Sequence, residues 1–186
     1  MKGKTILITG STDGVGRHVA ERLAAEGALA IVHGRDRARG EALAARIVNV
    51  ASAGQQAIDF SDVMLTRDYS GVRAYRQSKL AQIMFTFDLA EELAGRDISV
   101  TSLHPATYMN TTMVRLSGVQ PISTVEEGGA AILQLVRSSE LAGKSGLYFD
   151  GMRLSRANAQ AYDPAARRRL RKLSFALVGL ADPMAV

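Results

Sequence analysis

Residues 9–16 of the chain read Thr-Gly-Ser-Thr-Asp-Gly-Val-Gly and connect an apolar run at 4–9 to an amphipathic stretch at 15–26. Glycine tolerates positive φ angles and lets the backbone approach a ligand closely. A helix that starts after such a turn offers free N–H groups and the positive end of its dipole to a phosphate. No Gly-Lys-Ser/Thr follows, so the turn is not a mononucleotide P-loop. The pattern predicts a dinucleotide-binding turn; a tight turn without a ligand is the alternative.

The rest of the chain alternates short apolar runs with amphipathic stretches. Predicted strands cover 4–9, 28–33, 46–52, 98–103 and 146–149, and predicted helices cover 15–26, 36–46, 73–95, 123–138 and 164–178. Long loops are expected at 53–72 and 104–122. Strands that alternate with helices of this length indicate a parallel sheet covered on both faces. We therefore expect an α/β fold, a Rossmann-like doubly wound parallel sheet in three α/β/α layers, as a single domain over residues 1–186.

Composition argues against several classes of protein. The chain has no cysteine and three histidines, none in a zinc-hydrolase pattern, so no metal site is expected. No uncharged apolar run approaches the ~18 residues of a membrane-spanning helix. The amino terminus lacks the features of a signal peptide, which favours the cytoplasm.

The net charge of +5 is concentrated at 35–39 and 167–172, which we interpret as two solvated helix faces. A nucleic-acid or membrane-surface role for the 167–172 face is the alternative. Aromatic residues make up only 5% of the chain and form no RNA-binding motif, so no nucleic-acid partner is expected.

The end of the second predicted strand reads His-Gly-Arg-Asp at 33–36. In a dinucleotide-binding fold this position meets the adenosine ribose. Arg35 can pair with a 2′-phosphate, which favours NADP(H) over NAD(H). Asp36 is the residue type that NAD would prefer here, but it also suits the start of the following helix.

Tyr75 and Lys79 stand four residues apart at the start of the strongest predicted helix. Side chains at this spacing share one helical face. An ammonium close to a phenol favours the phenolate, so the tyrosine becomes a usable general acid and base near neutral pH. Taken alone, an ordinary solvated pair is the simpler interpretation; the upstream glycine turn favours the catalytic one.

In combination these features resemble the short-chain dehydrogenase/reductase family. The resemblance is carried by the glycine turn at 9–16, by the strand Ile-Val-Asn-Val-Ala-Ser that ends at Ser52, and by Tyr75-(x)3-Lys79. The tail over 145–180 is similar to the retinol dehydrogenase-like branch. The resemblance implies hydride transfer between a nicotinamide cofactor and a small-molecule alcohol or carbonyl substrate. It also implies a homodimer formed through the tyrosine helix.

The resemblance assigns a role to each matching residue. Tyr75 is the expected proton donor and acceptor, and Ser52 is expected to hydrogen-bond the substrate oxygen. Lys79 is expected to bind the nicotinamide ribose and to favour the phenolate. The residues expected to contact the cofactor are Gly10, Ser11, Thr12, Asp13, Gly14, Val15, Gly16, Arg35, Lys79, Pro105, Thr107 and Thr111.

The sequence also departs from the family pattern. The family has five strands before the tyrosine helix, whereas three are predicted before Tyr75 here. The Asn-Asn-Ala-Gly strand and the helix with a fourth catalytic residue, an asparagine, are missing; Asn49 does not match that motif. We therefore expect a sheet shortened by about two βα units.

This shortening leaves two expected outcomes for the sheet. The serine strand pairs with strand 4–9, which would shift Ser52 and Tyr75 by about one strand spacing, ~4.8 Å, or a gap remains with two free strand edges and an exposed core. The apolar face of 80–90 loses the packing of the missing helix and is expected to be exposed. An inactive family member that binds a dinucleotide or folds only in part is the alternative function.

Overall fold

The computed structural model describes residues 4–9, 14–33, 45–96 and 98–183. Strands and helices alternate along the described chain. The strands are β1 (Thr5–Thr9), β2 (Leu29–His33), β3 (Ala45–Val50), β4 (Ile98–His104), β5 (Leu147–Asp150) and β6 (Arg153–Ser155). The helices are α1 (Gly14–Ala25), α2 (Gly71–Glu92), α3 (Thr112–Leu116), α4 (Val125–Arg137) and α5 (Pro164–Leu177), with short 3-10 helices η1 (Ser139–Leu141) and η2 (Ala159–Tyr162).

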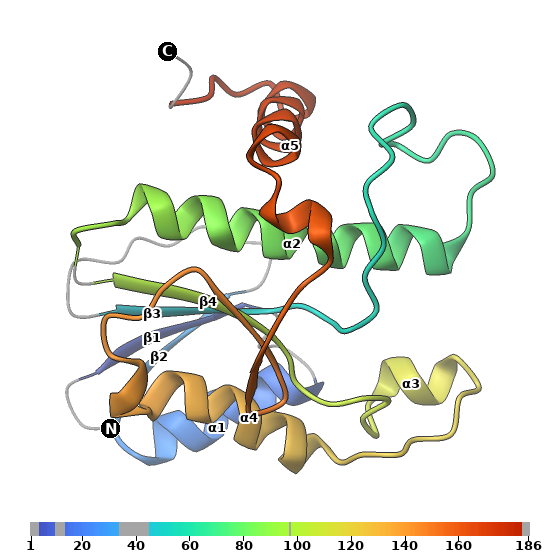
Figure 1. Ribbon diagram of the computed structural model, residues 1–186. Helices are drawn as coiled ribbons and strands as arrows, with labels where there is room; N and C mark the ends of the chain where they lie inside the picture. Colours follow the sequence, from blue (N-terminus) through green and yellow to red (C-terminus); the bar gives the residue numbers. More distant parts are fainter. Residues whose placement is uncertain (1–3, 10–13, 34–44, 97, 184–186) are drawn as a thin grey trace.

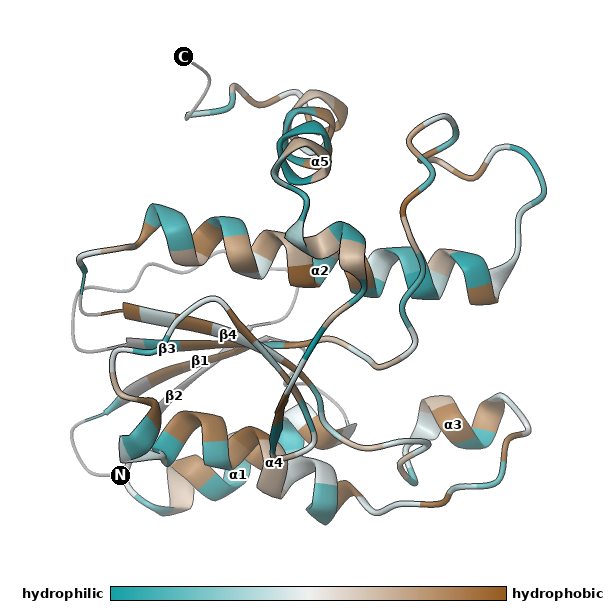
Figure 2. Cartoon of the chain, in the orientation of Figure 1, coloured by the Kyte–Doolittle hydropathy of each residue, from teal (hydrophilic) through white to brown (hydrophobic). Residues whose placement is uncertain are grey.

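The elements form three layers. Helices α1 and α4 lie on one face of the strands, α2 lies on the other, and α5 lies outside α2 (Figure 1). Apolar residues run along the strands and along α1 and α4, whereas α5 carries both hydrophilic and hydrophobic residues (Figure 2). This arrangement confirms the predicted α/β class with helices on both faces. Among the described residues, no helix combines the length and apolar character needed to cross a membrane.

The strands form two separate sheets. β1 pairs with β2 in parallel; β3, β4 and β5 follow one another in parallel, and β6 lies antiparallel at the edge. β1 and β3 contact each other, but within the described ranges no ladder joins them. The expected pairing of the serine strand β3 with β1 is therefore not seen in the described residues, and the two sheets remain separate.

Apolar side chains close the junction between β1 and β3. Ile6 and Ile8 of β1 are buried there, and Val48 and Val50 of β3 pack against the same cluster. The cavity between the two strands measures about 10 Å³, about the smallest space that holds a water molecule. Side chains from both strands, α1 and α4 fill the gap on this face, so the expected exposure of the core is wrong there; Leu7 of β1, by contrast, is 40% exposed.

The inner face of α2 is also buried. Leu80, Ile83 and Met84 are fully enclosed, in one apolar cluster with Ala161 of η2 and Ala166 of α5. The predicted exposure of the apolar face at 80–90 is wrong, because α2 packs on β4 and is also contacted by η2 and α5 of the C-terminal segment.

Charged side chains hold α5 on α2. Arg167 is only 9% exposed and forms ion pairs with Asp88 at 3.0 Å and with Glu91 at 2.6 Å. Arg171 forms further ion pairs with α2 and with the segment after α5. A charge this deeply placed is retained when it is paired. The interpretation of 167–172 as a solvated face is therefore wrong for these two arginines; residues 35–39 lie outside the described part of the chain.

Several boundaries differ from the prediction. α3 lies inside the loop expected at 104–122, where the Thr111 side chain caps its first turn. β6 was not expected either, because three residues are too few to show the alternation of apolar and polar residues that indicates a strand. α2 begins at Gly71, two residues early, because the Ser70 side chain caps it. The predicted helix at 36–46 falls outside the described residues up to 44, and 45–46 already belong to β3.

Candidate active site

Ser52 lies just beyond the carboxyl end of β3, which stops at Val50. Its side chain is buried, and its Oγ accepts a hydrogen bond from the Gly54 backbone N–H at 3.0 Å. A hydroxyl has one proton to donate and two lone pairs to accept with. Because Gly54 already supplies a donor, the Ser52 proton remains for an acceptor such as a substrate oxygen.

Tyr75 faces the same space as Ser52. It lies in the first turns of α2 and is 39% exposed. A methyl group placed on Gly54 would lie 3.4 Å from Ser52 Oγ and 3.6 Å from Tyr75 Cε1. Gly54 therefore leaves open the space between the two hydroxyl-bearing side chains. Reasoning from the sequence missed this glycine; its place two residues after the serine was the available signal.

Lys79 lies beneath the tyrosine ring. Its Nζ is 5.6 Å from the centre of the Tyr75 ring and donates to the Val50 carbonyl oxygen at 3.1 Å. Burial lowers the pKa of the Lys79 ammonium from its usual 10.5. The predicted Ser52, Tyr75 and Lys79 are thus brought together at the carboxyl end of β3, the edge where ligands bind in open α/β sheets.

Lys79 makes stability depend on pH in a defined direction. Because its pKa is lower in the folded protein than in the unfolded chain, the unfolded chain binds more protons between the two values, and stability rises with pH there. The free energy of unfolding, relative to that of Lys79→Met, is expected to increase as the pH rises toward 10.5. Urea unfolding of the wild type and of Lys79→Met across the alkaline pH range measures this difference in free energy. A difference that does not change with pH contradicts the prediction.

The described part of the phosphate turn fits a dinucleotide. α1 begins at Gly14, whose φ of 56° is in the left-handed region. Within Gly14–Ala25 the first turn holds no acidic residue, and the amino end of a helix offers N–H groups and a positive dipole to an anion. A methyl group on Gly14 would lie 3.5 Å from Thr111 Cγ2, so Thr111 lies beside the turn as expected. Gly10, Ser11, Thr12, Asp13 and Arg35 lie outside the described residues.

The strand-end residues after β4 occupy the same edge. His104 Nε2 lies 3.0 Å from Thr107 Oγ1, and burial lowers the pKa of the His104 imidazole. The His104–Thr107 contact holds the threonine side chain in place at this edge. Pro105 is buried behind it, packed near Gly128 of α4.

Gly14→Ala is expected to weaken NADPH binding by about tenfold, because a side chain at this φ is strained and the turn must shift. Gly71→Ala is the matched control, since a methyl group there meets nothing within 4 Å. Fluorescence titration of both variants with NADPH measures the change. Equal affinity in the two variants contradicts the assignment of this turn.

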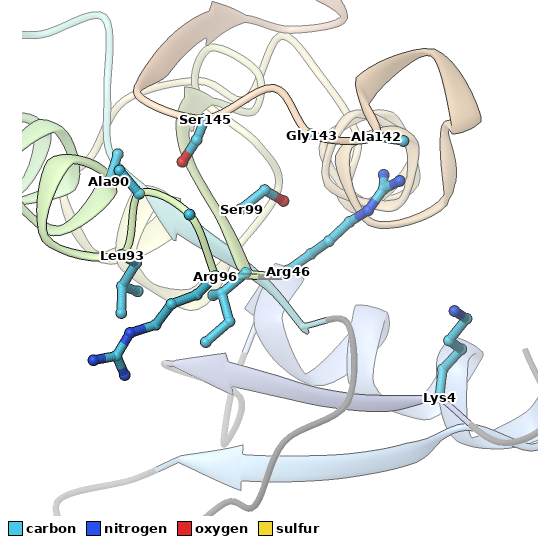
Figure 3. A pocket seen from close by; sticks show the side chains of 12 residues that line it. Lys4, Arg46, Ala90, Leu93, Arg96, Ser99, Ala142, Gly143 and Ser145 are labelled. Atoms are coloured by element: carbon cyan, nitrogen blue, oxygen red, sulfur yellow. The ribbon is translucent and has the colours of Figure 1, made fainter.

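A separate cavity of about 520 Å³ lies at the opposite, amino ends of β3 and β4. Its lining includes Arg46, Leu93, Arg96, Ser99 and Ser145. Figure 3 shows the Arg46 and Arg96 side chains pointing in different directions; the Arg46 guanidinium donates to the Leu135 carbonyl oxygen at 2.9 Å. These cations do not converge on one ligand, so the candidate site remains at the carboxyl edge.

Comparison with known proteins finds similar sequences. Residues 4–67 match the family model described as short chain dehydrogenase. Retinol dehydrogenase 13 of Homo sapiens is 34% identical over 156 residues, which cover 74% of this chain and 47% of that protein. Retinol dehydrogenase 11 of Mus musculus is 32% identical over 151 residues, or 75% of this chain and 48% of that protein. The chain thus spans about half the length of the curated relatives it matches.

A solved structure matches nearly the whole chain. An uncharacterized protein from Mycobacterium paratuberculosis superimposes with a TM-score of 0.71 at 18% identity, over 98% of this chain and 96% of the other. At this identity the likeness concerns the fold alone.

Proposed function

The chain belongs to the short-chain dehydrogenase/reductase family, in its retinol dehydrogenase-like branch, and from this premise we propose that it is an oxidoreductase acting on an alcohol/carbonyl pair with a nicotinamide dinucleotide. We propose NADP(H) rather than NAD(H) as the cofactor, and one NAD(P)-binding domain over residues 1–186. When bound, the nicotinamide supplies the hydride chemistry.

The observation that carries the proposal is the shared space between Ser52 and Tyr75. Ser52 donates its free hydroxyl proton to the substrate oxygen, and Tyr75 gives or takes the proton of that oxygen. Lys79 holds a positive charge beneath the Tyr75 ring and favours the phenolate form during the reaction. These three residues supply hydrogen bonding, acid–base catalysis and electrostatics from two neighbouring elements, the end of β3 and α2.

Two features support a dinucleotide at the adjoining edge. The amino end of α1, with Gly14 and the neighbouring Thr111, forms a place for a pyrophosphate. The preference for NADP(H) rests on Arg35 in the sequence, since a guanidinium pairs well with a 2′-phosphate. A homodimer through the outward face of α2 is consistent with Phe85, which is 52% exposed on that helix.

The deciding experiment is a fluorescence titration of the purified protein with NADPH and, separately, NADH. The chain has no tryptophan, so the nicotinamide signal is measured against a low background. We expect micromolar binding of NADPH, about tenfold weaker binding of NADH, and loss of this preference in Arg35→Ala but not in Arg37→Ala. NADPH oxidation with benzaldehyde, decanal and cyclohexanone then tests turnover.

Two results would count against the proposed function. A folded, monodisperse sample that binds neither cofactor contradicts the dinucleotide site. NADPH binding without turnover of any carbonyl would favour the alternative of a family member that binds a dinucleotide and is catalytically inactive.

A further inference from the structure

The carbonyl group of Ser52 has two side-chain partners. The β3 strand has ended at Val50, and Ala51 makes the last bond to the neighbouring strand by donating to the Leu103 carbonyl oxygen at 2.8 Å. Beyond that point the Ser52 carbonyl oxygen accepts from Tyr148 Oη at 3.1 Å and from Gln55 Nε2 at 2.9 Å. Side chains thus supply the hydrogen bonds that a buried carbonyl group needs beyond the end of the backbone ladder.

Both donors are held in place by the surrounding structure. Tyr148 lies in the middle of β5 and is only 3% exposed, so its ring has no freedom to turn away. Gln55 is oriented from its other end, because its Oε1 accepts from the Asn158 backbone N–H at 2.7 Å. The Ser52 carbonyl oxygen thus accepts one hydrogen bond from Tyr148, 96 positions away, and one from the neighbouring Gln55, which is itself tied to the distant Asn158.

Tyr148 remains a donor across the useful pH range. Burial, with a smaller effect from the nearby Asp150 carboxylate, raises its pKa to about 12. The phenol therefore keeps its proton at neutral and moderately alkaline pH. This environment is unlike that of the half-exposed Tyr75 and suits a structural hydrogen bond rather than proton transfer.

We propose that Tyr148, together with Gln55, is a positioning residue that fixes the Ser52 peptide and thereby aims the Ser52 hydroxyl at the space shared with Tyr75. The link is geometric. The Gly54 N–H that holds Ser52 Oγ follows the Ser52 carbonyl by one peptide, so a rotated carbonyl carries that donor away. A displacement of about 1 Å in a catalytic group costs about 100-fold in rate. The inference rests on the proposed function for its catalytic consequence, but not for its structural one.

A double-mutant cycle tests the catalytic consequence. Tyr148→Phe is expected to lower kcat with the best of the three carbonyl substrates by about tenfold, with the KM for NADPH unchanged. In a Ser52→Ala background the same substitution is expected to have no further effect, because it acts through the missing hydroxyl. An equal loss in both backgrounds overturns the proposal, since it would indicate a general structural defect.

Two further variants complete the cycle. Tyr162→Phe is the matched control, because its Oη accepts from the Ala157 backbone N–H at 3.0 Å rather than donating to the Ser52 carbonyl oxygen; the kcat of this variant is expected to be unchanged. Gln55→Ala removes the second donor from a half-buried side chain and is expected to reproduce the Tyr148→Phe effect, even if Tyr148→Phe folds poorly.

Amide hydrogen exchange tests the structural consequence without any turnover. In Tyr148→Phe the Gly54 amide is expected to exchange about tenfold faster than in the wild type, whereas the Ala51 amide, bonded to Leu103, keeps its rate. Unchanged exchange at Gly54 overturns the proposal. If the wild type shows no turnover, the proposed function fails, and the exchange result still decides the role of Tyr148.

Discussion

Tyr75→Phe is expected to abolish most carbonyl reduction, lowering kcat by about 100- to 10,000-fold, the range that a general acid or base contributes. The aromatic ring and its packing remain, so the decrease in kcat is due to the missing hydroxyl proton. NADPH affinity is expected to stay within about twofold, because the hydroxyl acts on the substrate oxygen. Steady-state NADPH oxidation with decanal and a binding titration measure the two effects.

Tyr69→Phe is the control for this substitution. Tyr69 precedes α2 and is 73% exposed, so the same chemical change there is expected to leave kcat unaltered. If Tyr75→Phe retains turnover similar to that of the control, Tyr75 does not exchange the proton, and the assignment of the catalytic group is wrong.

Leu80→Ala is expected to lower the free energy of unfolding by about 2–5 kcal/mol, as for other deletions of a fully buried leucine. Leu80 is 0% exposed and lies on the inner face of α2, directly after Lys79. Removal of its side chain leaves a cavity between α2 and the cluster that includes Ala161 and Ala166. Urea unfolding followed by circular dichroism measures the change.

Phe85→Ala provides the comparison on the opposite face of the same helix. Because Phe85 is half exposed, its loss is expected to change the free energy of unfolding by about 0.5 kcal/mol or less in the monomer. Similar losses in the two variants would mean that α2 is not packed as the structure shows. The pair therefore tests whether one face of α2 is buried in the core while the opposite face is exposed.

Much of the fold was predictable because its signals are local. Helix α4 shows this clearly: Thr124 and Glu127 form a capping box at its start, close to residue 123 where the helix was predicted to begin. Glycine at the end of α1 and aspartate before α5 indicate helix ends in the same way. In contrast, α3 depends on a cap at Thr111 inside a segment without periodicity, and β6 exists only because β5 lies beside it.

In the candidate site, too, residues with a local signal were predictable and residues joined by distant contacts were not. Tyr75 and Lys79 were predictable together because helical geometry places residues four apart on one face. Ser52 was identified by resemblance, and the structure brings it to the same space through Gly54. Tyr148 and Gln55 were not identified, since a buried tyrosine in a strand has the pattern of an ordinary core residue. Its contact with Ser52 joins residues 96 positions apart in the chain.

The sequence by itself determined the alternation of strands and helices, the glycine turn before α1, and the tyrosine–lysine pair of α2, because each depends on neighbours within a few residues. Only the tertiary structure decided how the shortened sheet is completed. Apolar packing, rather than a hydrogen-bonded ladder, closes the junction of β1 and β3, and α5 covers α2 through the paired Arg167. Burial and charge pairing depend on which distant segments meet, and local periodicity carries no information about that.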